Sequence, residues 1–397
     1  MTLNPSTRAV AGLVAALVAG AVGLGLALAG CGSGDPSATR TPPGGSAASS
    51  TAPTGSASGT PSGPLAVHEV GSVAVPSGNV GPLRVGGGAV VFPFATDPAA
   101  GWTRVGLMHA GDRTPTTVAR SQWPHGLVNW VAADGDWVAW VDQSAEQSDA
   151  TPKVLWRVWA LDTTTNQKVL LASNGSRADP YVPIVLGQDG WFFWTRAETD
   201  RTAREQIWKP GDDAPTDLLR HVEMTPGSES VSGDRLVYLG PAATASRGHT
   251  VGGDCWSVPV TGGTPEPLTH SALAMGCAAA GDVLTWSQHI APDTAKMPAL
   301  GLLDDPYTVW SQPLSGGRAT RLHQGYVLSS PLLAGDGFVS WDPDGRRVVR
   351  SLSTDATVML PKGSVSIRSA ASGRDLAWVT GGAGRPATVH LAEVTGG

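Results

Sequence analysis

The side chains that could carry out chemistry are few in this chain, and they form no recognised catalytic pattern. Three Cys and nine His are spread over 397 residues. No zinc-type spacing, no H-E-x-x-H helix, no G-x-S-x-G turn and no phosphate-binding loop is present. We therefore predict no catalytic residue, no metal site and no cofactor. The net charge of −6, with no basic cluster, also excludes nucleic acid as a partner.

Cys31 is the one side chain whose sequence context implies a covalent modification. It ends the tetrapeptide Leu28-Ala29-Gly30-Cys31, after an apolar run preceded by a single positive charge, Arg8. The tetrapeptide resembles the bacterial lipobox. That resemblance implies cleavage before Cys31 and a diacylglyceryl thioether on its thiol. An uncleaved membrane helix and a soluble secreted protein are the alternatives.

This reading divides the chain into three segments. Residues 1–30 are a lipoprotein signal peptide, and residues 31–64 are the lipidated Cys followed by a linker of Ser, Thr, Pro, Gly and Ala. Such a linker cannot bury a core and is expected to be disordered. Residues 65–397 are the globular domain. We expect a protein anchored by its lipid to the extracytoplasmic face of the cell membrane, because a diacylglyceryl group supplies the two chains that stable anchoring needs.

The two remaining cysteines, Cys255 and Cys277, form an even pair. The compartment outside the cytoplasm is oxidising, so an even pair favours a disulfide. Two free buried thiols are the alternative.

The elements that position all the remaining side chains are defined by a short repeated motif. A Gly/Asp turn is followed by an apolar run with an aromatic residue, as in GDWVAW at Gly135–Trp140 and GDVLTW at Gly281–Trp286. Seven copies occur, the first of them degenerate. Their aromatic residues are Phe92, Trp140, Trp194, Tyr238, Trp286, Trp341 and Trp378. Strand-like alternation and turn residues surround each copy.

These copies predict an all-β fold, a seven-bladed β-propeller of four-stranded antiparallel blades. The seventh copy ends before an outer strand, whereas Gly71–Ser77, before the first copy, resembles the outer strands of other copies. We predict that Gly71–Ser77 closes the ring, because an open sheet edge is a liability. A frayed N-terminal segment is the alternative.

The stretches Trp256–Gly263 and Trp310–Gly317, each an aromatic followed by a run ending in Gly-Gly, resemble the repeats of TolB-like periplasmic propellers. This resemblance implies the propeller fold, as in WD-repeat-like proteins. TolB-like propellers have six blades and an additional α/β domain, whereas this chain has seven copies and no second domain. The TolB role is therefore not transferred.

The loops between second and third strands are long in blades two to five. They share one end of a propeller with the connections between blades, and we call this end the looped face. We predict that the looped face binds a protein, peptide or glycan partner without catalysis, and that the protein is a monomer. The candidate binding residues are Trp123, His125, Arg196, Asp200, Arg201, His249, His289, Asp304, Asp305 and Tyr307.

Two other functions remain open. One is an extracytoplasmic hydrolase or lyase acting on cell-wall or extracellular carbohydrate, and the other is an accessory domain of a transporter or secretion complex. Catalysis would require acids around the axis of the propeller. Inner strands such as NWVAAD and GCAAAG contain almost no ionisable group, which argues against an enzyme.

Overall fold

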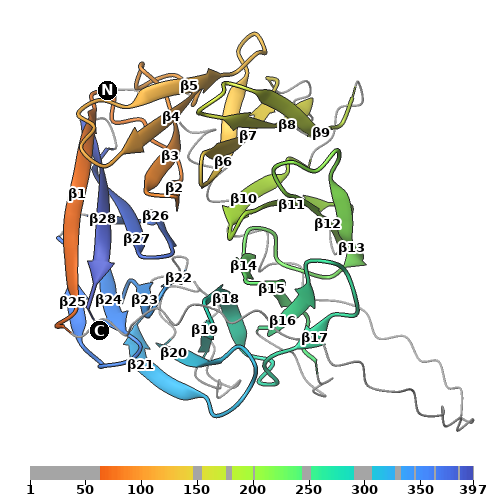
Figure 1. Cartoon of the computed structure of the whole chain (residues 1–397), viewed down its shortest axis with the longest axis vertical. Coiled ribbons are helices and arrows are strands. Elements are labelled where there is room, and N and C mark those ends of the chain that lie inside the picture. Colours follow the sequence, from red (N-terminus) through yellow and green to blue (C-terminus); the bar gives the residue numbers. More distant parts are fainter. Residues whose placement is uncertain are drawn as a thin grey trace, which may run out of the picture. The chain divides into compact units, whose positions relative to one another are not determined.

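Seven four-stranded antiparallel sheets form a ring in the computed structural model (Figure 1). The structure describes residues 63–145, 154–175, 181–199, 202–243, 252–289, 306–326, 332–343, 346–361, 364–382 and 385–396. Each sheet is one blade, and its first strand faces the axis of the ring. The prediction of an all-β, seven-bladed propeller is therefore confirmed. The part of the chain described here contains no helix able to cross a membrane.

The strands of each blade follow one another outward from the axis. Blade 1 consists of β2 (Arg84–Gly86), β3 (Ala89–Phe94), β4 (Arg104–His109) and β5 (Thr116–Arg120). Blade 2 consists of β6 (Leu127–Asp134), β7 (Trp137–Gln143), β8 (Trp156–Asp162) and β9 (Lys168–Ser173). Blade 3 consists of β10 (Ile184–Gln188), β11 (Trp191–Ala197), β12 (Ala203–Trp208) and β13 (Thr216–Val222). Blade 4 consists of β14 (Ser230–Ser232), β15 (Arg235–Gly240), β16 (Asp254–Pro259) and β17 (Glu266–Pro267). Blade 5 consists of β18 (Ala274–Ala280), β19 (Val283–His289), β20 (Pro306–Pro313) and β21 (Thr320–Tyr326). Blade 6 consists of β22 (Leu333–Gly335), β23 (Phe338–Trp341), β24 (Val348–Ser351) and β25 (Thr357–Met359).

Blade 7 combines both ends of the described chain. Its first three strands are β26 (Ser364–Ser372), β27 (Asp375–Gly381) and β28 (Ala387–Thr395), and its outer strand is β1 (Ala66–Val75). Strand β1 pairs antiparallel with β28, with Val73 opposite Val389. The predicted closure is confirmed, although the strand begins at Ala66, before the predicted Gly71. Pairing of β1 satisfies the edge that β28 would otherwise expose.

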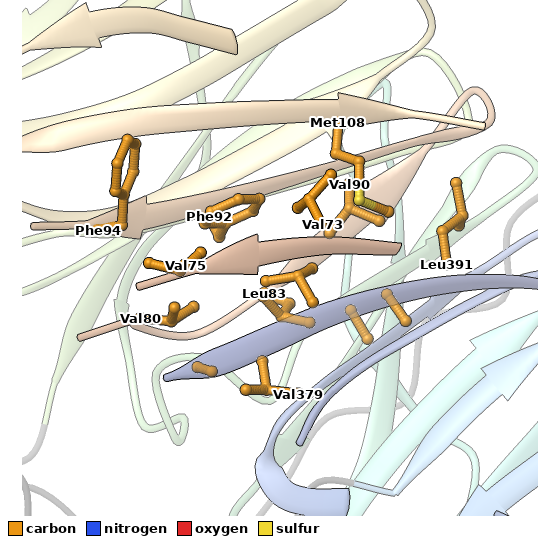
Figure 2. Close-up of a cluster of buried hydrophobic side chains, with 14 of the residues drawn as sticks. Val73, Val75, Val80, Leu83, Val90, Phe92, Phe94, Met108, Val379 and Leu391 are labelled. Carbon is orange, nitrogen blue, oxygen red and sulfur yellow. The ribbon is translucent and has the colours of Figure 1, made fainter. Parts of the chain in front are cut away.

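The seven repeated aromatic residues fill equivalent gaps between neighbouring blades. All lie on the second strand of their blade, and none is more than 4% exposed. Each belongs to a different cluster of buried side chains, one cluster for each junction in the ring. Figure 2 shows the junction of blades 7 and 1, where Phe92 lies beside Val73 and Val75. These clusters explain the motif, because a large aromatic side chain is needed to fill the gap where two twisted sheets diverge.

The Gly/Asp turns join adjacent blades as well as adjacent strands. Gly135 and Gly281 have φ of 55° and 57°, values that a tight hairpin requires and that glycine adopts without strain. The carboxylate of Asp189 accepts a hydrogen bond of 3.1 Å from the amide of Gly233 in the next blade, and Asp375 accepts one of 2.9 Å from Gly88. We call this end of the ring the hairpin face, since it lies opposite the looped face.

Cys255 on β16 and Cys277 on β18 form a disulfide, with sulfur atoms 2.04 Å apart. The bond links blades 4 and 5, as predicted from the even pair. Cys31, the predicted signal peptide and most of the predicted linker lie outside the described residues.

Candidate functional site

The connection between β5 and β6 holds two of the predicted binding residues in an ordered loop. The buried carboxylate of Asp142, at the end of β7, accepts hydrogen bonds of 2.6 Å from the Ser121 hydroxyl and 3.1 Å from the Gln122 amide. The amide of Gly126 donates to the carbonyl of Trp123 over 3.0 Å, and His125 has φ of 58°. This network fixes a loop that exposes Gln122, Pro124 and His125 to solvent.

Trp123 packs beneath a cation. The guanidinium carbon of Arg157, on β8, lies 4.3 Å from the centroid of the Trp123 ring, within the range of a cation–π contact. The indole Nε1 of Trp123 is buried and has no hydrogen-bond partner among the described residues. The Trp123 side chain therefore supports the loop from below, whereas Pro124 and His125 present the exposed surface.

Arg196 continues the same pattern in the next blade. It lies at the end of β11, and its guanidinium is 5.4 Å from the ring of Trp156 on β8. The looped face over blades 2 and 3 thus carries two half-buried arginines, Arg157 and Arg196, each stacked on a tryptophan. Arginine and aromatic side chains are enriched at the energetic centres of protein interfaces.

The other predicted binding residues are Tyr307, His289 and five residues that lie outside the described chain. Tyr307 is only 6% exposed and packs with Val309 and Trp341 in the core between blades 5 and 6, so we correct its assignment from binding residue to core residue. His289 ends β19, opposite Tyr307 in the strand register. Five further candidates lie outside the described residues: Asp200, Arg201, His249, Asp304 and Asp305.

A buried pair of glutamates, which the sequence analysis missed, lies at the junction of blades 3 and 4. The hydroxyl of Thr195 on β11 is 2.7 Å from Oε2 of Glu205 on β12, and it also contacts Oε1 of Glu229, just before β14. Glu205 is fully buried, and Glu229 is 8% exposed. Oε1 of Glu205 and Oε2 of Glu229 are buried without a hydrogen-bond partner in the described part of the chain.

Burial makes this pair difficult to ionise. Desolvation and the neighbouring Glu229 raise the pKa of Glu205 well above its usual value, although the Thr195 hydroxyl acts in the opposite direction. Desolvation also raises the pKa of Glu229 to about 7, against the effects of hydrogen bonding and of Arg84. At neutral pH the pair therefore retains at least one proton.

Arg84 carries an opposite charge that acts on Glu229 from another part of the ring. It lies on the inner strand β2 of blade 1, and its Nη1 donates a 2.9 Å hydrogen bond to the carbonyl of Leu83. Desolvation lowers the pKa of Arg84 to about 10, and the charge of Glu229 partly counteracts this effect. Blades 1 and 4 are not neighbours, so this interaction crosses the axis of the ring.

One local signal could have identified half of the pair. In Ala203–Trp208 the buried positions alternate with half-exposed ones, and Glu205 occupies a buried position between Ala203 and Ile207. A charged residue at a core position of a strand is unusual and indicates a specific partner. Nothing in the sequence around Glu229 identifies that partner.

The pair is placed to hold a proton, and its burial does not suit contact with a substrate. A catalytic acid must reach the reacting atoms, whereas both carboxyl groups are enclosed between blades. No group of three or more His, Cys, Asp and Glu in the described residues is arranged to bind a metal ion.

Comparison with known proteins supports the fold. No family model matches the sequence, and no curated protein matches it. The β-propeller domain of the Trilobed protease from Pyrococcus furiosus superimposes with a TM-score of 0.52 and 8% identity, over 80% of this chain and 94% of that one. A puromycin-hydrolyzing peptidase from Mycobacterium tuberculosis superimposes with a TM-score of 0.51 and 14% identity, over 81% of this chain. The match covers 54% of the peptidase chain. At these identities the similarity establishes the propeller fold alone.

Proposed function

We propose that this protein is a monomeric, lipid-anchored propeller that binds a protein, peptide or glycan partner on its looped face, without catalysis. The observation that carries the proposal is the Ser121–Gly126 loop. Buried Asp142 holds this loop in one conformation, although its outer residues contact solvent. A preorganised loop loses little conformational entropy on binding, so it suits recognition.

The chemistry of the surface favours a partner with polar and planar groups. Exposed His125 and Pro124 lie beside the stacked pair of Arg157 and Trp123. Arginine donates hydrogen bonds in a planar fork, to carboxylate, carbonyl or sugar oxygens. A peptide or glycan edge lying across the loop would meet these donors.

The location is proposed from the sequence of the N-terminal region. A diacylglyceryl group on Cys31 would hold the protein on the extracytoplasmic face of the cell membrane, and the TolB-like character of the repeats fits such a location. The disulfide between Cys255 and Cys277 is consistent with an oxidising compartment.

One observation favours the alternative of a hydrolase or lyase acting on carbohydrate. Glu205 and Glu229 form the kind of perturbed acid pair found in glycoside-cleaving sites. Their burial opposes this role, because a sugar could not reach either carboxyl group without separation of blades 3 and 4.

Site-specific crosslinking in intact cells tests the binding proposal. A photoreactive residue in place of Gln122 should yield a discrete adduct. Mass spectrometry identifies the partner in this adduct, and purification of that partner should then recover the same adduct. Trp123→Ala should abolish the adduct. Trp191→Ala is the matched control, because Trp191 is also a half-buried tryptophan facing a cation, Lys209 at 5.4 Å, but lies at the hairpin face. Equal crosslinking from Asp234 at the hairpin face would refute recognition by the looped face.

Incubation of the purified protein with envelope polysaccharide tests the enzyme alternative. We expect no release of reducing ends or unsaturated products. Turnover that is lost in both Glu205→Gln and Glu229→Gln, with unchanged thermal stability, would instead establish the carbohydrate-cleaving function.

A further inference from the structure

The arrangement of Thr195, Glu205 and Glu229 requires a bound proton. A hydroxyl group has one hydrogen, so Thr195 can donate to only one of the two carboxyl groups that it contacts. The other carboxyl group must itself donate to the Thr195 oxygen. With one proton on the pair, both contacts are hydrogen bonds, and without it one of them becomes a contact between oxygens that carry no hydrogen.

The same three residues join two blades at a specific point. Thr195 and Glu205 face each other on β11 and β12 of blade 3, whereas Glu229 belongs to the connection that leads from β13 into blade 4. The rest of this connection is fastened to blade 4: the amide of Thr225 donates to the carbonyl of Leu239 over 2.9 Å, and the Ser228 hydroxyl accepts from the Leu239 amide over 3.2 Å. Glu229 is therefore a polar link from this connection back to blade 3.

The charged groups near the pair leave Arg84 as its counterion. On β11 to β13 and the turn after β11, Arg204 pairs with Glu198 and Asp217. Arg220 also pairs with Asp217, His221 pairs with Glu198 over 2.7 Å, and Arg196 stacks on Trp156. On β16, the carboxylate of Asp254 accepts from Thr269 over 2.8 Å, and Glu223 in the connection is exposed. The charge of Arg84, on β2 of blade 1, lowers the pKa of Glu229.

We propose that Thr195, Glu205 and Glu229 form a proton-dependent latch that fastens blade 3 to the connection entering blade 4. When the shared proton is present, the latch is closed. When the proton leaves to solvent, the two carboxylates repel each other, Thr195 stays with one of them, and Glu229 turns toward Arg84. The connection between β13 and β14 is then released from blade 3.

The position of the latch links it to the looped face. Thr195 immediately precedes Arg196, whose guanidinium lies over Trp156 in the candidate binding surface. The released connection also lies at the looped face. Acidification near neutral pH would therefore tighten this part of the surface, since the pKa of Glu229 is raised to about 7.

Hydrogen–deuterium exchange of the segment 223–229 tests the latch. The full-length protein is labelled at about pH 5.5 and about pH 8.5, with exchange times corrected for the intrinsic rate. We expect protection of this segment to fall by about tenfold at the higher pH. In Glu229→Gln, whose side-chain amide is a permanent donor, protection should be the same at both values. In Thr195→Val it should be low at both.

Glu223→Gln is the matched control. It changes an exposed glutamate of the same connection to glutamine, so its exchange should follow the wild type at both pH values. Protection that does not change with pH in the wild type would overturn the latch. So would a pH response that persists unchanged in Glu229→Gln. Restoration of protection at the higher pH by millimolar calcium alone would show that the pair binds a cation instead of a proton.

Discussion

The imidazole Nδ1 of His390 lies 3.2 Å from the carboxylate of Glu69 and joins the closing strand β1 to β28. The same ring stacks on Trp378, with centroids 5.0 Å apart, and its Nε2 lies 2.8 Å from the hydroxyl of Thr380 on β27. The N-terminal strand is thus tied through one histidine to the core of the last blade. The circle of blades is closed by β1, so the stability of the propeller should depend on this strand.

The closing strand gives the first prediction. Val73 is 1% exposed and packs between blades 7 and 1, whereas Ala74, the next residue, faces solvent. Val73→Asp should lower the free energy of unfolding by about 3 kcal/mol or more, because it buries a charge, and Ala74→Asp should change it by less than about 0.5 kcal/mol. Thermal unfolding followed by circular dichroism measures both.

A chain beginning at Gly81 should lose most of its stability, and a melt identical to that of the whole protein would argue against closure by β1.

The second prediction concerns the disulfide between Cys255 and Cys277. Reduction should destabilise the protein by about 3 kcal/mol in the chain-entropy description. The double variant Cys255→Ala, Cys277→Ala should be insensitive to reductant, which provides the control. Under denaturing conditions without reductant, neither cysteine should react with a thiol reagent. Two reactive thiols would show that the bond is not formed in the cell.

The third prediction is a loss of stability as pH rises. The pKa of Glu229 is raised to about 7 in the folded protein, and that of Glu205 is also raised. Above the usual glutamate pKa the folded state therefore binds more protons than the unfolded state, so the free energy of unfolding decreases with pH through about pH 7. For Glu229 the shift corresponds to at most about 3 kcal/mol.

Denaturant unfolding across this range measures the slope. Glu205→Gln and Glu229→Gln should each flatten the profile and should gain stability relative to wild type as pH rises. Glu223→Gln, an exposed substitution, should leave the slope unchanged. Desolvation also raises the pKa of Asp134 and Asp189 at the hairpin face, so a shallower slope of the same sign should remain in the glutamine variants. A wild-type profile that rises with pH would contradict the assignment.

The fourth prediction tests how the Ser121–Gly126 loop is held. Asp142→Ala removes the acceptor of two hydrogen bonds and should cost about 1–3 kcal/mol. It should also raise hydrogen exchange in the loop and weaken the crosslink from Gln122. Ser121→Ala removes one of the two donors and should have the smaller effect on both measurements. An unchanged crosslink in Asp142→Ala would mean that the conformation of the loop does not matter for binding.

Much of the propeller could be predicted because its information is local. An aromatic residue such as Trp140 or Trp194 recurs at a fixed distance from a Gly/Asp turn, and both hairpin formation and strand alternation depend on residues close in sequence. The outer strand β1 could be assigned because blade 7 lacked one. By contrast, Tyr307 was placed on the binding surface because it follows a long loop, and only its packing against Val309 and Trp341 shows that it belongs to the core.

Seven blades and their aromatic wedges could be deduced from the sequence because both follow from short-range periodicity, and the ring closure could be deduced because the seventh copy lacks an outer strand. The assembled fold was needed to show that Glu205 and Glu229 share the hydroxyl of Thr195, and that the charge of Arg84 on another blade acts on Glu229. Their proximity depends on the register of strands within blade 3 and on the order of blades around the axis. The resulting pKa values depend on burial, which is a property of the assembled ring and of no single segment.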